Sequence, residues 1–462
     1  MGNAFQFVEG FQPSRANKRL IRRHAMIGRN AGKSVHRASR LSLATKQPPR
    51  QCSLPRRSFV TLHHGDAQKN EITGPVSILA SLGDGFLSCS LPVEFTPSSL
   101  RVVSQFFNFV IEKMYPTRLG GAAQEYQYIY LRAMFPDEAT AKCSIALMDA
   151  TNAFFVRGSP HGSEGLQHYS RSLAVVSDRL RGREALADST LMLIVLLVLQ
   201  EQMRQEVEAA RVHYEGLKKM IQLRGGLAQL EDNGPVALKI CKMDICFSLY
   251  HGGPISFCQS CEASMQPRPH REATTIILPH DLDPSLQNIL LDAMDLASTL
   301  NRGKNCPEYQ RLDLQMILVS VGCRLLKFQP LESAHDCSET DKIYHVGLLL
   351  YMMTLFFQYD LQRVWEFPLV MRRLQDVLAP YSRISLEKER NGLLLWTLLM
   401  GSIWAMADTR ERWAVTMLRE AINDMKITDF DGMLSSVNKL PWVHSIHDEP
   451  ARSLWNIIKG DS

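Results

Sequence analysis

The feature that most constrains the fold is a periodic series of apolar residues that ends at two consecutive glycines. Its members recur at steps of three and four, a spacing that places them on one face of a helix over residues 190–224. They are Leu196, Leu199, Met203, Val207, Ala210, Tyr214, Leu217 and Ile221. Arg224 stands in the last turn, where a cation suits the helix dipole. Gly225-Gly226 then predicts a helix end with one of these glycines at positive φ.

A second helix is predicted directly after the first. Residues 236–249 are largely apolar, and a Gly-Gly-Pro sequence at 252–254 ends them. Two helices joined by a short turn form an αα-hairpin, and their apolar faces pack on each other or on neighbouring helices. The simplest interpretation is that this stretch is the core hairpin of a helical protein.

The hairpin also resembles a known family, the fungal-specific transcription factor domain. The resemblance rests on His-x-x-Gly-Leu at 213–217, Leu-Arg-Gly-Gly-Leu at 223–227, an aspartate at 244 and Gly-x-Pro-Ile-x-Phe at 252–257. It implies a nuclear transcriptional regulator with a helical regulatory domain. The motif residues that it implies for the fold of this domain are His213, Gly216, Leu217, Arg224, Gly225, Gly226, Asp244, Pro254 and Phe257.

The number and spacing of the cysteines differ from those expected for this family. Such a domain usually follows a binuclear zinc cluster with six cysteines, whereas residues 1–60 contain one cysteine, Cys52. Cys258 and Cys261 form a C-x-x-C pair, but no second matching pair completes a four-ligand zinc site. We therefore expect no zinc cluster, no other metal and no cofactor. The ten cysteines, without an export signal, are most simply reduced thiols of a cytosolic or nuclear protein.

Charge divides the chain into a basic arm and an acidic body. Residues 1–60 hold 13 of the 52 Lys and Arg and one of the 47 acidic residues, so their net charge is +12 and that of the remainder is −7. Within the arm, Phe-Gln-Phe-Val at 5–8 and the segment 19–26 resemble the N-terminal segment of regulators of this type that lack a zinc cluster. The basic clusters of the arm are Lys18, Arg19, Arg22 and Arg23.

Four interpretations of this arm remain open. The clusters suit a nuclear import signal, and they also suit contacts with DNA phosphates, which do not depend on base sequence. An Arg- and Ser-rich segment with few acids is also typical of a mitochondrial presequence. The fourth interpretation is a solvated tail without a partner.

The remaining sequence predicts an all-α fold, a multi-helix bundle or solenoid-like regulatory domain. We divide the chain into a mostly disordered arm at 1–60, a loop-rich linker at 61–96 and a helical domain at 97–462, with a sub-boundary near 258–282. Thr96-Pro97 and Asp283-Pro284 are predicted helix starts, and Asp408 with Glu411 is another. Further helices are predicted at residues 137–155, 168–180, 308–328, 341–359, 368–379, 387–407 and 409–425.

No sequence motif of catalysis stands out. The chain has no phosphate-binding loop, dinucleotide fingerprint, nucleophile elbow or His-Glu-x-x-His, so we do not expect an enzyme. Asp244 lies among apolar residues, and a buried carboxylate needs a partner. Arg224 and Lys242 are the candidate cations, and we predict a structural ion pair rather than an acid–base site.

The resemblance makes a transcriptional regulator in the nucleus the leading hypothesis, and it implies a local pathway such as a secondary-metabolite gene cluster. Its partners would be other regulators or a second copy of the chain, with weak or indirect DNA contact and no membrane, since the longest apolar run has nine residues, 191–199. Methionines at 352, 353, 400 and 406 are predicted in the core, where they suit a small-molecule effector as well as simple packing. The alternative is a helical scaffold or co-regulator that has lost the zinc cluster.

Overall fold

A computed structural model describes the protein over most of its helical body. The described residues are 95–107, 134–135, 137–157, 163–204, 206–230, 234–257, 281–302, 311–332, 337–356, 367–381, 388–405 and 412–460. They all belong to one compact unit, whereas a second unit, Val8–Ser81, lies outside them. The predicted arm, residues 61–94 of the predicted linker and residues 258–280 of the predicted sub-boundary near 258–282 also lie outside the described residues. The same holds for the Cys258/Cys261 pair and for the helix start at Asp408.

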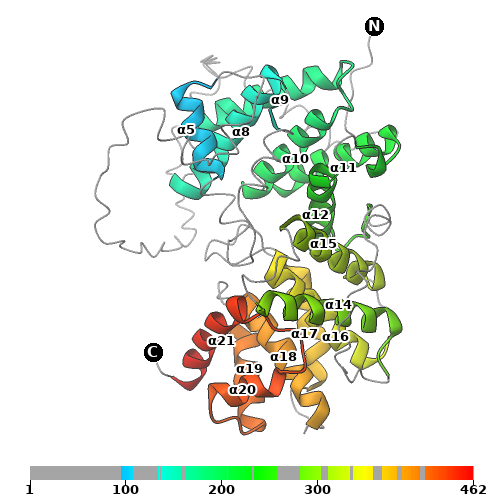
Figure 1. The fold of residues 1–462 in the computed structure, drawn as a ribbon, viewed down its shortest axis with the longest axis vertical. Coiled ribbons are helices and arrows are strands. Elements are labelled where there is room, and N and C mark those ends of the chain that lie inside the picture. Colours follow the sequence, from blue (N-terminus) through cyan, green and yellow to red (C-terminus); the bar gives the residue numbers. More distant parts are fainter. Residues whose placement is uncertain are drawn as a thin grey trace, which may run out of the picture. The chain divides into compact units, whose positions relative to one another are not determined.

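The described residues are helical and contain no β-strand, so the all-α prediction is confirmed. Figure 1 shows the helices in chain order from blue to red. The helices of the first half are α5 (Pro97–Gln105), α8 (Glu138–Arg157), α9 (Ser163–Leu180), α10 (Asp188–Met203), α11 (Val207–Arg224) and α12 (Gly234–His251), with a short 3-10 helix η3 (Leu227–Gln229).

The second half contains eight more α-helices in the described part of the chain. They are α14 (Pro284–Asn301), α15 (Arg311–Phe328), α16 (Glu339–Phe356), α17 (Pro368–Leu378), α18 (Lys388–Ala405), α19 (Arg412–Asp424), α20 (Phe430–Val437) and α21 (His444–Lys459). The predicted helices at 308–328, 341–359, 368–379, 387–407 and 409–425 correspond to α15–α19 with small changes at their ends. The last two helices, α20 and α21, are not predicted from the sequence.

Local capping signals place several helix starts as predicted. Thr96 accepts a hydrogen bond from the Ser99 amide at 3.2 Å, with Pro97 in the first turn of α5. Asp283 does the same for Ser285 at 2.7 Å before α14. These caps satisfy amide groups that a helix start leaves without an internal partner.

The helix α10 forms the centre of the first half. Every residue from 191 to 198 is buried, so this helix needs neighbours on all sides, and it contacts α8, α9, α11 and α12. The apolar run is thus a buried helix, as predicted. Within the described residues, no helix combines the length and the apolar character needed to cross a membrane.

One prediction about this region is wrong. Residues 190–224 do not form a single helix, because the chain breaks between Met203 and Val207. At the break, the Glu206 amide reaches back to the carbonyl of Glu201 at 2.9 Å, one residue further than in an α-helix. Helix α11 then packs extensively on α10, so the main hairpin is α10–α11 rather than α11–α12.

The second half is built around α16 and α18, which lie side by side (Figure 1). Residues 343–356 of α16 are all buried. The two helices approach closely at Gly347, where a Cβ atom would lie 2.5 Å from the Trp396 ring. Met352, Met353 and Met400 are buried in this core, as predicted, and Met406 lies outside the described residues.

Side-chain hydrogen bonds attach residues 441–443, just before α21, to this core. Trp396 donates to the carbonyl of Pro441 at 2.9 Å, and Asn301 donates to that of Trp442 at 2.7 Å. His447, fully buried, accepts from the Val443 amide at 3.0 Å. Helices α14, α18 and α21 thereby hold the Pro-Trp turn in place, which makes the C-terminal helices part of the folded core.

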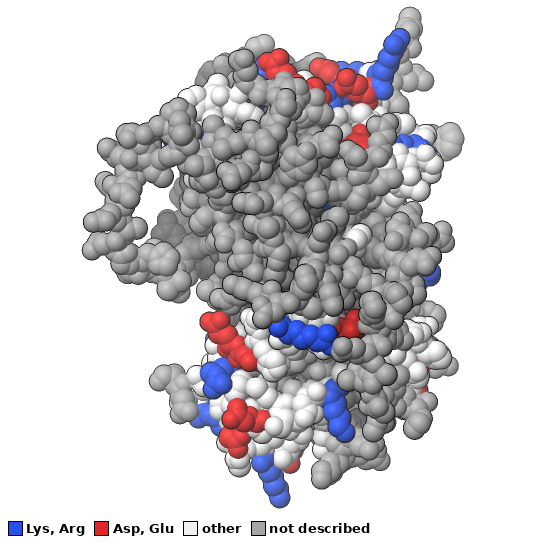
Figure 2. All heavy atoms as spheres, in the orientation of Figure 1, with Lys and Arg blue, Asp and Glu red and all other residues white. Residues whose placement is uncertain are grey.

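Charged side chains of both signs are interspersed on the surface. On the face drawn in Figure 2, Lys and Arg lie close to Asp and Glu, and no broad area of one sign appears among the coloured residues. Some exposed charged side chains of the described residues pair within one helix, such as Lys142 with Glu138 at 2.5 Å. Exposed pairs of this kind contribute little to stability, typically 0.2–1 kcal/mol.

Candidate functional site

The Gly-Gly turn of the motif is a helix-ending structure. Gly225 has φ +94° and Gly226 has φ +102°, so both glycines occupy a conformation that side chains with a Cβ avoid. Their amides bond back to the carbonyls of Gln222 at 3.1 Å and Ile221 at 2.9 Å, the pattern of a Schellman motif. The predicted helix end is confirmed, with two positive φ angles instead of one.

Arg224 fastens this turn to the start of α10. Its guanidinium forms an ion pair with Asp188 and donates to the carbonyl of Leu186 at 2.8 Å. It also donates to the carbonyl of Gln229, the last residue of η3, at 3.1 Å. The arginine therefore holds together the end of α11, the turn that follows and the N-terminus of α10.

Asp244 is buried, but the predicted ion pair is wrong. One carboxylate oxygen accepts from the Tyr214 hydroxyl, and the other accepts from the amides of Ser256 at 2.8 Å and Phe257 at 2.7 Å. Arg224 is engaged by Asp188, and Lys242 donates to the carbonyl of Phe356. Neutral donors replace the cation that the sequence argument assumed.

The environment of Asp244 explains this choice of partners. Burial raises the pKa of the carboxyl group, and the bonds from Tyr214 and the two amides oppose that rise. The ring of Tyr214 also stacks on Phe247 at 4.1 Å. We call the Asp244 carboxylate with Tyr214, Ser256 and Phe257 the carboxylate clamp; it ties α11, α12 and the segment after α12 to one another.

The remaining motif residues lie around this clamp. Gly216 and Leu217 are buried on α11, whereas His213 is half-buried on the same helix. Pro254 is exposed in the segment after α12. The clamp thus joins residues of α11, α12 and the segment after α12, whereas Arg224 and the Gly-Gly turn end α11 beside the start of α10.

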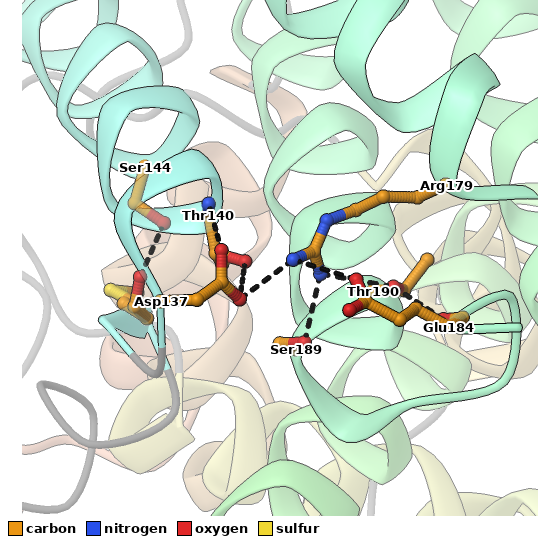
Figure 3. Close-up of polar contacts among 8 residues, drawn as sticks. Asp137, Thr140, Ser144, Arg179, Glu184, Ser189 and Thr190 are labelled. Carbon is orange, nitrogen blue, oxygen red and sulfur yellow. Dashed lines mark hydrogen bonds and ion pairs between the residues drawn. The ribbon is translucent and has the colours of Figure 1, made fainter. Parts of the chain in front are cut away.

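A second polar cluster lies at the junction of α8, α9 and α10 (Figure 3). Arg179, at the end of α9, has only 9% of its side chain exposed and pairs with Asp137 at 2.6 Å and Glu184 at 3.0 Å. It also donates to Ser189 at 3.0 Å. Asp137 caps α8 by accepting from the Thr140 amide at 2.8 Å.

The contacts of Arg179 connect the end of α9 with the starts of α8 and α10. Partial burial raises the pKa of Asp137, but the bonds from Thr140 and Arg179 outweigh this and hold the pKa below its ordinary value. Sequence reasoning missed this cluster. The available signal was Asp137 three residues before Thr140, a capping pattern; its pairing with an arginine 42 positions away is set by tertiary structure.

Another buried carboxylate, Glu201, lies next to the α10–α11 break and was also missed. It accepts from the Tyr169 hydroxyl, while the Arg204 guanidinium lies over the Tyr169 ring at 5.0 Å and 4.0 Å from the carboxylate. Burial raises the pKa of Glu201, because the charged form loses its hydration.

This shift gives a pH-dependent prediction for Glu201→Gln. A carboxyl group whose pKa is raised on folding costs nothing below its unfolded pKa and destabilises progressively as pH rises toward its folded pKa. Glutamine removes that cost and keeps an oxygen that accepts from Tyr169. We expect the melting temperature of the variant, relative to wild type, to be higher at about pH 8 than at about pH 4.5. Glu208→Gln, an exposed control, should show no such trend.

The three clusters connect helix ends and neighbouring segments of the chain to one another. Among the described residues, no group of three or more His, Cys, Asp or Glu is arranged to hold a metal ion. Comparison of the chain with protein-family models, curated proteins and solved structures found no match.

Proposed function

We propose that this protein is a nuclear transcriptional regulator that acts through protein contacts of its helical body. The observation that supports it most is the carboxylate clamp, which links motif residues of α11 and α12 to the segment at 256–257. The resemblance to the fungal-specific transcription factor domain rests on these same positions. A sequence motif that is shared within a domain family because of its fold is expected to consist of residues that pack against one another and that end helices.

The body would act with other regulators or with a second copy of itself, in a local pathway such as a secondary-metabolite gene cluster. Residues 1–60 would bring it to the nucleus through their excess of positive charge. The same charge supports weak DNA contact that falls steeply with salt, because phosphate neutralisation releases counterions without reading bases. A second candidate, a scaffold or co-regulator that contacts DNA only through partners, is favoured by the single cysteine in residues 1–60.

A tethering experiment tests whether the helical body regulates transcription or serves only as a scaffold. The full chain is fused to a sequence-specific DNA-binding module and placed at a reporter promoter. We expect transcription to change several-fold relative to the module alone, because the helical body would recruit other regulators. An unchanged reporter, with the fusion present in the nucleus, would favour the scaffold.

The basic arm gives a separate prediction about location. A fluorescent protein fused to the arm should accumulate in the nucleus, and changing Arg19, Arg22 and Arg23 to Ala should release it to the cytoplasm. A matched variant that changes three other arginines of the arm, 37, 40 and 50, removes the same charge and should still enter the nucleus. Mitochondrial fluorescence would instead support the presequence interpretation.

A further inference from the structure

We draw no further inference here: the strongest candidate, the stripe of half-buried apolar side chains along α19 at Trp413, Met417 and Ala421, lies on a helix face for which nothing in the described part of the structure shows what covers it.

Discussion

Replacing Asp244 with alanine is expected to lower the free energy of unfolding by about 3 kcal/mol or more. The change leaves the hydroxyl of Tyr214 and the amide of Phe257, two buried residues, without their acceptor, and it also removes the acceptor of the amide of Ser256, an exposed residue. Each unsatisfied buried group costs about 1–3 kcal/mol, and removal of the buried charge offsets part of the sum. Urea unfolding followed by circular dichroism measures the change through its transition midpoint.

Two further variants test whether the loss of stability comes from the hydrogen bonds of the carboxylate clamp. Asp244→Asn keeps an oxygen for the two amides and loses only the acceptor for Tyr214, so it should cost less than alanine. Asp178→Ala removes an aspartate with 77% of its side chain exposed and should change stability by less than about 0.5 kcal/mol. If Asp244→Ala unfolds at the same urea concentration as wild type, the carboxylate clamp does not stabilise the fold.

The double variant Gly225→Val plus Gly226→Val is expected to cost about 2–4 kcal/mol. Both positions have positive φ, where a Cβ crowds the backbone and a β-branched residue is strongly disfavoured. The cost arises from the backbone rather than from lack of space, since the nearest atom to a Cβ at Gly225 is 3.4 Å away and none lies within 4 Å at Gly226. Thermal melting measures this loss. Gly253→Val, at a glycine that has open space and no positive φ, is the matched control.

The same double variant links the fold to the proposed function. The tethered reporter should lose its response, because misdirecting the exit from α11 would disturb packing on α10, whereas the basic arm should still carry the protein into the nucleus. A double variant that melts like wild type yet abolishes reporter output would show that the Gly-Gly turn is a contact surface. The structural account of the motif would then be wrong.

The sequence by itself determined the features that depend on local chemistry. Apolar spacing predicted most of the α-helices of the described residues, although not α20 and α21, and side-chain caps at Thr96 and Asp283 placed two helix starts. The Gly-Gly pair predicted the end of α11 because a left-handed residue at that position is a local requirement. These signals involve residues within a few positions of each other, so no knowledge of distant neighbours was needed.

Only the tertiary structure decided where the chain reverses and which polar groups meet. The apolar spacing continues through residues 203–207 without showing the break, which is favoured because α11 can then cover α10. The Asp244 carboxylate accepts hydrogen bonds from neutral donors on α11 and on the segment after α12, although lysine side chains lie nearer to it in the sequence. Burial brings together residues that are far apart in the chain. Apolar periodicity and capping signals involve only neighbouring residues, so they do not predict which distant residues pair.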